Sequence, residues 1–114
     1  MQIPKQIIVG SYVFDVVFKD KVILDENIDE YRDTIPSGGL LEVDGLISEA
    51  DELIELRRGL RGSRREVTVW HEIIHAIEYT KEIKLSEEDV EKFAEAIVQV
   101  LRDNPQLVKK SKQK

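Results

Sequence analysis

The pentapeptide His71-Glu72-Ile73-Ile74-His75 contains both histidines of the 114-residue chain. On an α-helix, side chains at positions i and i+4 lie on one face about 5–6 Å apart, so the two imidazoles can reach a single metal ion. Glu72 follows the first histidine directly, where it can reach a water activated by that ion. The alternative is that both histidines are ordinary polar residues of a helix face. The spacing favours a catalytic metal site.

The residues around this pentapeptide predict a buried helix. Ser63 and Glu66, three positions apart, match a capping box at its start. The polar residues fall on one stripe, which comprises Thr68, His71, Glu72, His75, Glu78 and Tyr79. A helix that is apolar on its other sides is expected to be buried, so the polar stripe should face a cleft or the solvent.

Length and composition predict one globular domain over residues 1–108, followed by a basic, flexible tail over residues 109–114. The formal net charge of −6 argues against nucleic-acid binding. The chain has no cysteine, so histidine and carboxylate side chains must hold any metal. We find no signal peptide and no run of about 18 apolar residues. We therefore expect a cytoplasmic protein with no membrane partner.

The part of the chain before the pentapeptide predicts a small, mostly antiparallel sheet. Four β-rich stretches cover Gln6–Val9, Tyr12–Phe18, Leu40–Ser48 and Leu53–Leu56, and Lys21–Leu24 could add a short strand. Gly10-Ser11 is typical of a tight hairpin turn, and residues 49–52 predict a second turn. The acidic stretch Asp25–Gly39 predicts a long loop, which could cover a cleft as a lid.

A second helix should begin after Ser86, with Ser86 as its N-cap and an acidic first turn. Its predicted buried stripe consists of Val90, Phe93, Ala94, Ile97, Val100 and Leu101. Asn104-Pro105 should end it. The sequence thus predicts an α+β fold, in which the sheet packs on the first helix and the second helix braces it.

A catalytic zinc site needs three protein ligands and one open position. His71 and His75 supply two, and the second helix offers Glu87, Glu88, Glu91 and Glu95 for the third. The spacing Glu87-x-x-x-Glu91 resembles the E-x-x-x-D element of glutamate-type zincins, with Glu in place of Asp. This resemblance implies that Glu87 binds zinc and that Glu91 orients a ligand histidine. Glu91 is also the first alternative for the third ligand, ahead of Glu88 and Glu95.

A wider resemblance rests on V-T-V-W-H-E-I-I-H-A-I-E-Y and L-S-E-E-D-V-E-K-F-A, and it covers residues 64–105. The chain resembles small phage- and prophage-encoded metallopeptidases near the ImmA/IrrE-like group. In their E-x-x-A-[DN]-x-F-A element, Val90 takes the Ala place and Glu91 the Asp/Asn place. The resemblance implies a minimal zincin-like domain, zinc as cofactor and endopeptidase activity on a protein or peptide. In the ImmA branch it suggests cleavage of a phage or mobile-element repressor.

Glu72 is the expected general base of such a site. Tyr79 lies one turn beyond His75 and could stabilise an oxyanion, as could Tyr12 or Tyr31. Five arginines within residues 57–65 could bind an acidic partner, or form a solvated loop that opposes the acidic stretch Asp25–Asp33.

Two alternatives to a peptidase stay open at this point. One is a regulatory or interaction module of phage origin that binds metal without proteolytic activity. The other is an accessory protein that binds a partner through its arginines. The sequence leaves the oligomeric state open.

Overall fold

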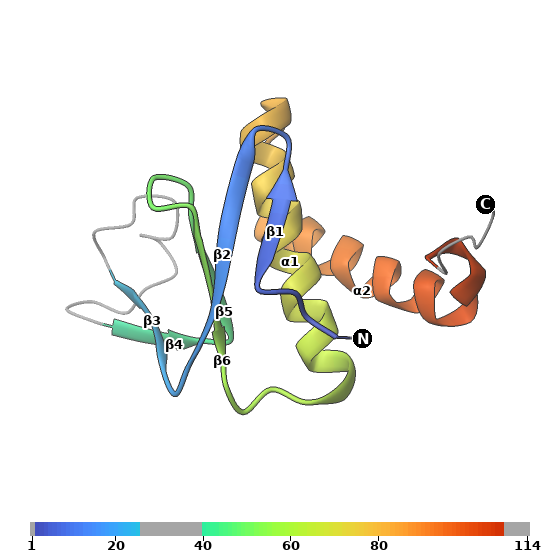
Figure 1. Cartoon of the computed structure of the whole chain (residues 1–114), viewed down its shortest axis with the longest axis horizontal. Coiled ribbons are helices and arrows are strands. Elements are labelled where there is room, and N and C mark those ends of the chain that lie inside the picture. Colours follow the sequence, from blue (N-terminus) through green and yellow to red (C-terminus); the bar gives the residue numbers. More distant parts are fainter. Residues whose placement is uncertain (1, 26–39, 109–114) are drawn as a thin grey trace.

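The computed structural model describes residues 2–25 and 40–108 and shows an α+β fold (Figure 1). The strands are β1 (Gln6–Val9), β2 (Tyr12–Lys19), β3 (Val22–Asp25), β4 (Leu40–Val43), β5 (Gly45–Ser48) and β6 (Leu53–Arg57). The helices are α1 (Gly62–Lys81), α2 (Glu87–Asp103) and a short 3₁₀ helix over Pro105–Leu107. Neither α-helix is long and apolar enough to cross a membrane. Asp25, the first residue of the predicted lid, ends β3. The rest of the predicted lid, which includes Tyr31, and the predicted tail lie outside the described residues.

The main sheet has four strands in the order β1-β2-β6-β5. Its β1–β2 and β5–β6 pairs are antiparallel hairpins, as predicted, whereas the central β2–β6 pair is parallel. Gly10 adopts φ +60 in the first hairpin turn, a backbone conformation that glycine tolerates best. The strands β3 and β4 form a separate antiparallel pair. The sheets are therefore mostly antiparallel.

The prediction of one strand over Leu40–Ser48 was wrong, because the chain bends at Asp44 and changes sheets there. The Asp44 carboxylate accepts hydrogen bonds from Arg57 Nε at 3.1 Å and from Arg64 Nε at 2.6 Å. Its backbone carbonyl accepts from Arg57 N–H at 2.8 Å. These contacts fix the bend, so that β4 pairs with β3 while β5 continues along β6.

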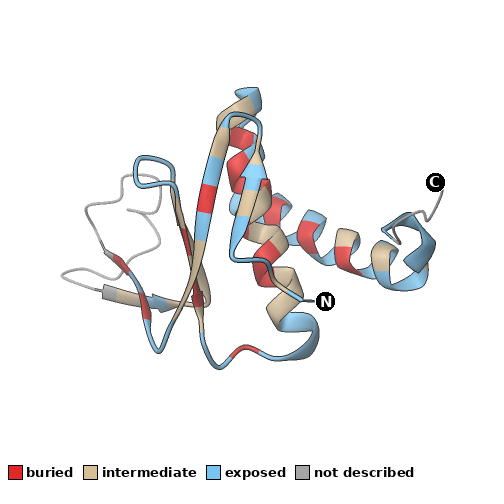
Figure 2. Ribbon diagram, viewed as in Figure 1, coloured by how far each residue is buried: buried red, intermediate tan, exposed pale blue. Residues whose placement is uncertain are grey.

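Helix α1 lies between the main sheet and α2 (Figure 2). On the sheet side the buried cluster comprises Phe14, Ile47, Ile54, Leu56, Val69 and Ala76. On the α2 side it comprises Ile74, Val90 and Ala94. Fully burying a side chain of this size stabilises a fold by about 1.5–3 kcal/mol. The helix that carries the pentapeptide is thus held from two sides.

The predicted capping box at the start of α1 was wrong. The N-cap is Arg61 and makes no side-chain capping hydrogen bond. Ser63 lies inside the first turn, where its hydroxyl accepts a hydrogen bond from Arg102 Nη2 at 2.7 Å. Ser63 therefore ties the start of α1 to the end of α2.

Helix α2 begins as predicted, since the Ser86 hydroxyl accepts a hydrogen bond from Asp89 N–H at 3.1 Å. Its buried stripe differs from the prediction, because Phe93 and Val100 are 52% and 49% exposed. Figure 1 shows α2 leading away from the sheet, so one face of α2 packs on α1 and the C-terminal part of the helix has no sheet beside it. That face carries Val90, Ala94 and Val98.

Candidate metal centre

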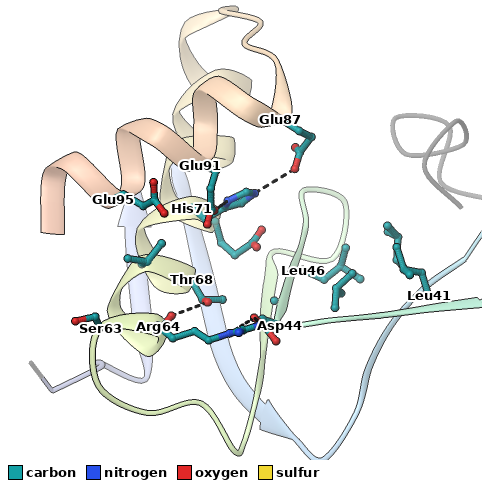
Figure 3. Close-up of a pocket in the computed structure, with 15 residues that line it drawn as sticks. Leu41, Asp44, Leu46, Ser63, Arg64, Thr68, His71, Glu87, Glu91 and Glu95 are labelled. Carbon is teal, nitrogen blue, oxygen red and sulfur yellow. Dashed lines mark hydrogen bonds and ion pairs between the residues drawn. The ribbon is translucent and has the colours of Figure 1, made fainter.

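Two helices bring the three predicted ligands together. His71 and His75 lie one turn apart on α1, and Glu87 is the first residue of α2. One Glu87 carboxylate oxygen is 3.2 Å from His71 Nε2 (Figure 3), and the other is 2.8 Å from His75 Nε2. One donor atom from each of the three residues lies within 4.8 Å of the other two. The first turn of α2 thus sets Glu87 against both imidazoles.

The other candidate third ligands take different positions. Glu91 contacts His71 on its far ring nitrogen, with Oε1 2.8 Å from Nδ1. Glu88 is exposed and pairs with Lys92 at 3.5 Å. Glu95 lines a cavity between α1 and α2, and no contact with either histidine is found for it in the described part of the chain. Glu87 is therefore the acid on α2 that lies where it could hold a metal ion together with both histidines.

A carboxylate also holds the far nitrogen of the second histidine. Glu78 Oε1 is 2.6 Å from His75 Nδ1, and Glu78 Oε2 accepts a hydrogen bond from Leu85 N–H at 2.7 Å. Both Nδ1 atoms thus face carboxylates, and both Nε2 atoms point at Glu87. Glu78 belongs to the polar stripe predicted from the sequence, but its contact with His75 was not predicted. Its position three residues after His75 was the available signal.

These three donors fit a zinc ion. Two imidazole nitrogens and one carboxylate oxygen form the His₂Glu set of catalytic zinc sites, which keep a fourth position open. Histidines that bind zinc usually donate their other ring N–H to a carboxylate or carbonyl, which fixes the tautomer and the ring orientation. His71 with Glu91 and His75 with Glu78 both show this arrangement.

The three residues also shift one another's pKa in the metal-free protein. Burial lowers the pKa of His75, but its hydrogen bond with Glu87 and the charge of Glu72 outweigh burial and raise that pKa to about 9. The pKa of His71 is raised by the same competition, with burial opposed by Glu87 and Glu72. Burial raises the pKa of Glu87, yet hydrogen bonds from both histidines lower it to about 2.

Glu72 lies beside this cluster and lines a cavity of about 710 Å³. Its side chain is buried, with 4% of the residue exposed. The cavity runs between α1, α2, β4 and β5 (Figure 3). A Cβ atom built on Gly45 of β5 would lie 3.1 Å from Glu72 Oε2, so a residue without a side chain allows β5 to approach the acid closely. We call this cavity the cleft.

No family model, no curated protein and no solved structure matches the chain. The resemblance to ImmA/IrrE-like zincins therefore stays a prediction that rests on the residues of the two helices.

Of the predicted oxyanion stabilisers, Tyr79 and Tyr12 are described by the structure, and neither lines the cleft. Tyr79 packs against the buried cluster on the sheet side of α1. Tyr12 donates a hydrogen bond to Glu49 Oε2 at 2.6 Å, which ties the first hairpin to the β5–β6 turn. Tyr31 lies outside the described residues.

Proposed function

We propose that this protein is a zinc-dependent endopeptidase. The observation that carries the proposal is the convergence of His71 Nε2 and His75 Nε2 on Glu87, with Glu91 and Glu78 behind the two rings. A salt-bridged pair of surface histidines would not need a carboxylate on all four ring nitrogens. A site that holds a metal by its Nε2 atoms would need this arrangement.

Glu72 is the proposed general base and acid. Zinc, when bound, would supply a Lewis acid that polarises the scissile carbonyl and lowers the pKa of water. The Glu72 carboxylate would take the proton of the attacking water and pass it to the leaving amine. Its burial in the cleft supports this role, because a carboxylate shielded from bulk water interacts more strongly with a proton donor.

The free edge of β5 supports a peptide as the substrate. Arg57 N–H donates to Asp44 C=O, so Asp44 and Arg57 form a hydrogen-bonded pair of the β5–β6 ladder. In an antiparallel ladder such pairs alternate, which turns the backbone groups of Gly45 and Ile47 away from β6. No second strand pairs with β5 in the part of the chain that the structure describes. An extended peptide could add to this edge beside Glu72.

The test is zinc content and hydrolysis in Glu72→Gln. We expect the variant to bind one equivalent of zinc and to hydrolyse a pool of fluorogenic peptides at least 100-fold more slowly than wild type. Glu88→Gln is the matched control, because Glu88 is an exposed acid that lies outside the cleft. Full activity in Glu72→Gln would overturn the mechanism. A zinc-loaded wild type that hydrolyses none of the peptides would favour a metal-binding regulatory module.

A further inference from the structure

The arginine cluster, defined here as Arg57, Arg58, Arg61, Arg64 and Arg65, has no part in the proposed chemistry. Most of its members have structural partners. Arg58 pairs with Asp20 at 2.5 Å, and Arg65 lies over the Phe18 ring, 5.5 Å from its centroid. The acids that pair with the cluster in the described residues are thus Asp20 and Asp44, whereas most of the predicted partner stretch Asp25–Asp33 lies outside them.

Arg64 differs from the other four because it lines the cleft. It lies seven residues before His71 on α1, which is two helical turns, or about 10 Å along the axis. Figure 3 shows Arg64 and Asp44 at one end of the cleft and Glu87 at the other. A molecule bound to the candidate metal centre could therefore reach Arg64 along the same cavity.

The guanidinium of Arg64 keeps capacity for another anion. Its Nε and Nη2 contact one oxygen of Asp44, at 2.6 and 2.5 Å, and no contact of Nη1 is found within the described residues. The side chain of Arg64 is 67% exposed. Asp44 also pairs with Arg57 at 3.1 Å, so one carboxylate faces two guanidinium groups. One positive charge is therefore left over at this end.

The α2 wall of the cleft has the opposite sign. Glu87, Glu91 and Glu95 follow one another at four-residue spacing and all line the cavity. Glu95 has no hydrogen bond or ion pair in the part of the chain that the structure describes, so its charge is not compensated there. A substrate carboxylate would be repelled from this wall and attracted to Arg64.

We propose that Arg64 is a specificity-determining residue that binds a carboxylate of the peptide substrate about three residues from the scissile bond. The proposal rests on the proposed peptidase function. Arg64 and His71 are about 10 Å apart along the axis of α1, and an extended strand, which advances about 3.3 Å per residue, covers this length in three residues. Arg64 lies beside Asp44, which precedes β5. Antiparallel pairing on β5 would therefore place the carboxylate on the C-terminal side of the scissile bond.

The carboxylate could come from an Asp or Glu side chain or from a free C-terminus. A set of peptides in two arms distinguishes these two sources. The first arm uses C-terminally amidated peptides with Glu or Gln moved through each position from four before to four after the scissile bond. The second arm uses peptides that end three residues after that bond, with a free or amidated C-terminus. We expect wild type to prefer a carboxylate about three residues after the scissile bond by about tenfold in kcat/KM. The arm in which this preference is seen identifies the source of the carboxylate.

Variants then test the role of Arg64 itself. In Arg64→Gln the tenfold preference should fall to about one, and in Arg64→Glu it should turn into a preference for Lys at that position. Arg61→Gln is the matched control, because Arg61 is exposed and lies outside the cleft. Zinc content should match wild type in all three variants. The melting temperature should fall in the two Arg64 variants, which lose the contact with Asp44, and should stay unchanged in Arg61→Gln. A preference that persists unchanged in Arg64→Gln would overturn the proposal.

A binding measurement tests the Arg64 site separately from the proposed peptidase activity. If zinc-loaded wild type hydrolyses none of the peptides, their binding is measured by fluorescence anisotropy with zinc-loaded wild type and zinc-loaded Arg64→Gln. About tenfold tighter binding of carboxylate peptides, lost in Arg64→Gln, would support the Arg64 site although the peptidase function had failed. Equal binding of Glu and Gln peptides to wild type would overturn it.

Discussion

Glu78 Oε1 lies 2.6 Å from His75 Nδ1, and both side chains are buried. The other oxygen of Glu78 accepts the backbone N–H of Leu85 at 2.7 Å. One carboxylate therefore orients a candidate ligand on α1 and also holds the connection that leads into α2. Because Glu87 follows two residues after Leu85, Glu78 links the positions of two candidate ligands that come from different helices.

Glu78→Gln should weaken both zinc binding and the fold. We expect a 10- to 100-fold lower zinc affinity, since a neutral amide holds the His75 ring less firmly in its ligand orientation. We also expect the melting temperature to fall, because the change disturbs two hydrogen bonds of a buried charged group, which are worth about 1.5–3 kcal/mol each. Competition with a chromophoric chelator and thermal unfolding measure the two effects.

Glu91→Gln is the matched control for Glu78→Gln. Glu91 holds the Nδ1 atom of His71 in the same way, but its side chain is 49% exposed. We expect a reduced zinc affinity with little change in melting temperature, because water can solvate the exposed amide. A Glu78→Gln protein as stable as Glu91→Gln would contradict the structural part of the role that we assign to Glu78.

Glu87→Ala should cost more zinc affinity than either of these variants, because it removes a ligand rather than a group behind one. We expect a loss of more than about 100-fold. In the metal-free variant the pKa of His75 should fall from about 9, since the hydrogen bond and charge of Glu87 help to raise it. Chelator competition and NMR titration of the imidazole would measure these changes.

Glu88→Ala is the control for Glu87→Ala, because it removes the neighbouring acid without touching the histidines. Its zinc affinity should equal that of wild type. Retention of one tightly bound zinc in Glu87→Ala would show that another residue is the third ligand.

The local parts of this site could be predicted from the sequence, and the long-range parts could not. Two features depend only on residues within one or two helical turns: the placement of His71 and His75 on one helix face, and the N-cap at Ser86. Local sequence patterns therefore predict both. The bend at Asp44 depends on Arg57 and Arg64, which lie 13 and 20 residues away. An acid within a mostly apolar run does not reveal such distant partners in the sequence.

Burial on α2 was harder to predict for a related reason. Phe93 and Val100 have the spacing of a buried stripe, yet α1 covers only the face that carries Val90, Ala94 and Val98. Periodicity shows that a helix has an apolar side, but the crossing of two helices decides how much of that side is covered. The parallel pairing of β2 with β6 is also a contact between distant segments.

The stability of the metal-free protein should depend on pH through His75 and Glu87. The pKa of His75 is about 9 in the folded state, above its ordinary value of 6.5, so its contribution is complete below pH 6.5 and is lost as the pH rises through 9. The pKa of Glu87 is about 2, below its ordinary 4.5, so its contribution is present above pH 4.5 and is lost as the pH falls through 2. Because both contributions are complete between about pH 4.5 and 6.5, we expect the ion pair of His75 and Glu87 to raise the melting temperature most in that range.

Zinc binding should release protons, because the raised pKa of His75 keeps its imidazole protonated in the metal-free protein. At pH 7.5 the His75 imidazole of the metal-free protein is protonated, and it must lose that proton to become a ligand. We expect about one proton or more per zinc, measured by calorimetry in buffers with different ionisation enthalpies. The apparent zinc affinity should rise between pH 6 and 9. Binding without proton release would contradict the raised pKa of His75.

Gly45→Ala tests the close approach of β5 to α1. The added Cβ would lie 2.7 Å from Thr68 Cγ2, 3.1 Å from Glu72 Oε2 and 3.3 Å from Leu56 Cδ2. Thr68 cannot easily rotate away, because its hydroxyl donates a hydrogen bond to Arg64 C=O at 2.8 Å. We expect a loss of about 1–3 kcal/mol in the free energy of unfolding, as is typical of overpacking. Hydrolysis should also fall, because β5 and Glu72 are pushed apart.

Thr68→Ser supplies the complementary change, since it removes the Cγ2 methyl and keeps the hydroxyl. In the double variant Gly45→Ala/Thr68→Ser we expect the stability to recover most of the loss caused by Gly45→Ala. Denaturant unfolding of the two single variants and the double variant forms a double-mutant cycle, and the coupling energy should favour the double variant by about 1 kcal/mol or more. A coupling energy near zero would mean that the Thr68 methyl does not set the distance between β5 and α1. Because Glu72 Oε2 would still lie 3.1 Å from the new Cβ, the double variant should regain stability more fully than activity.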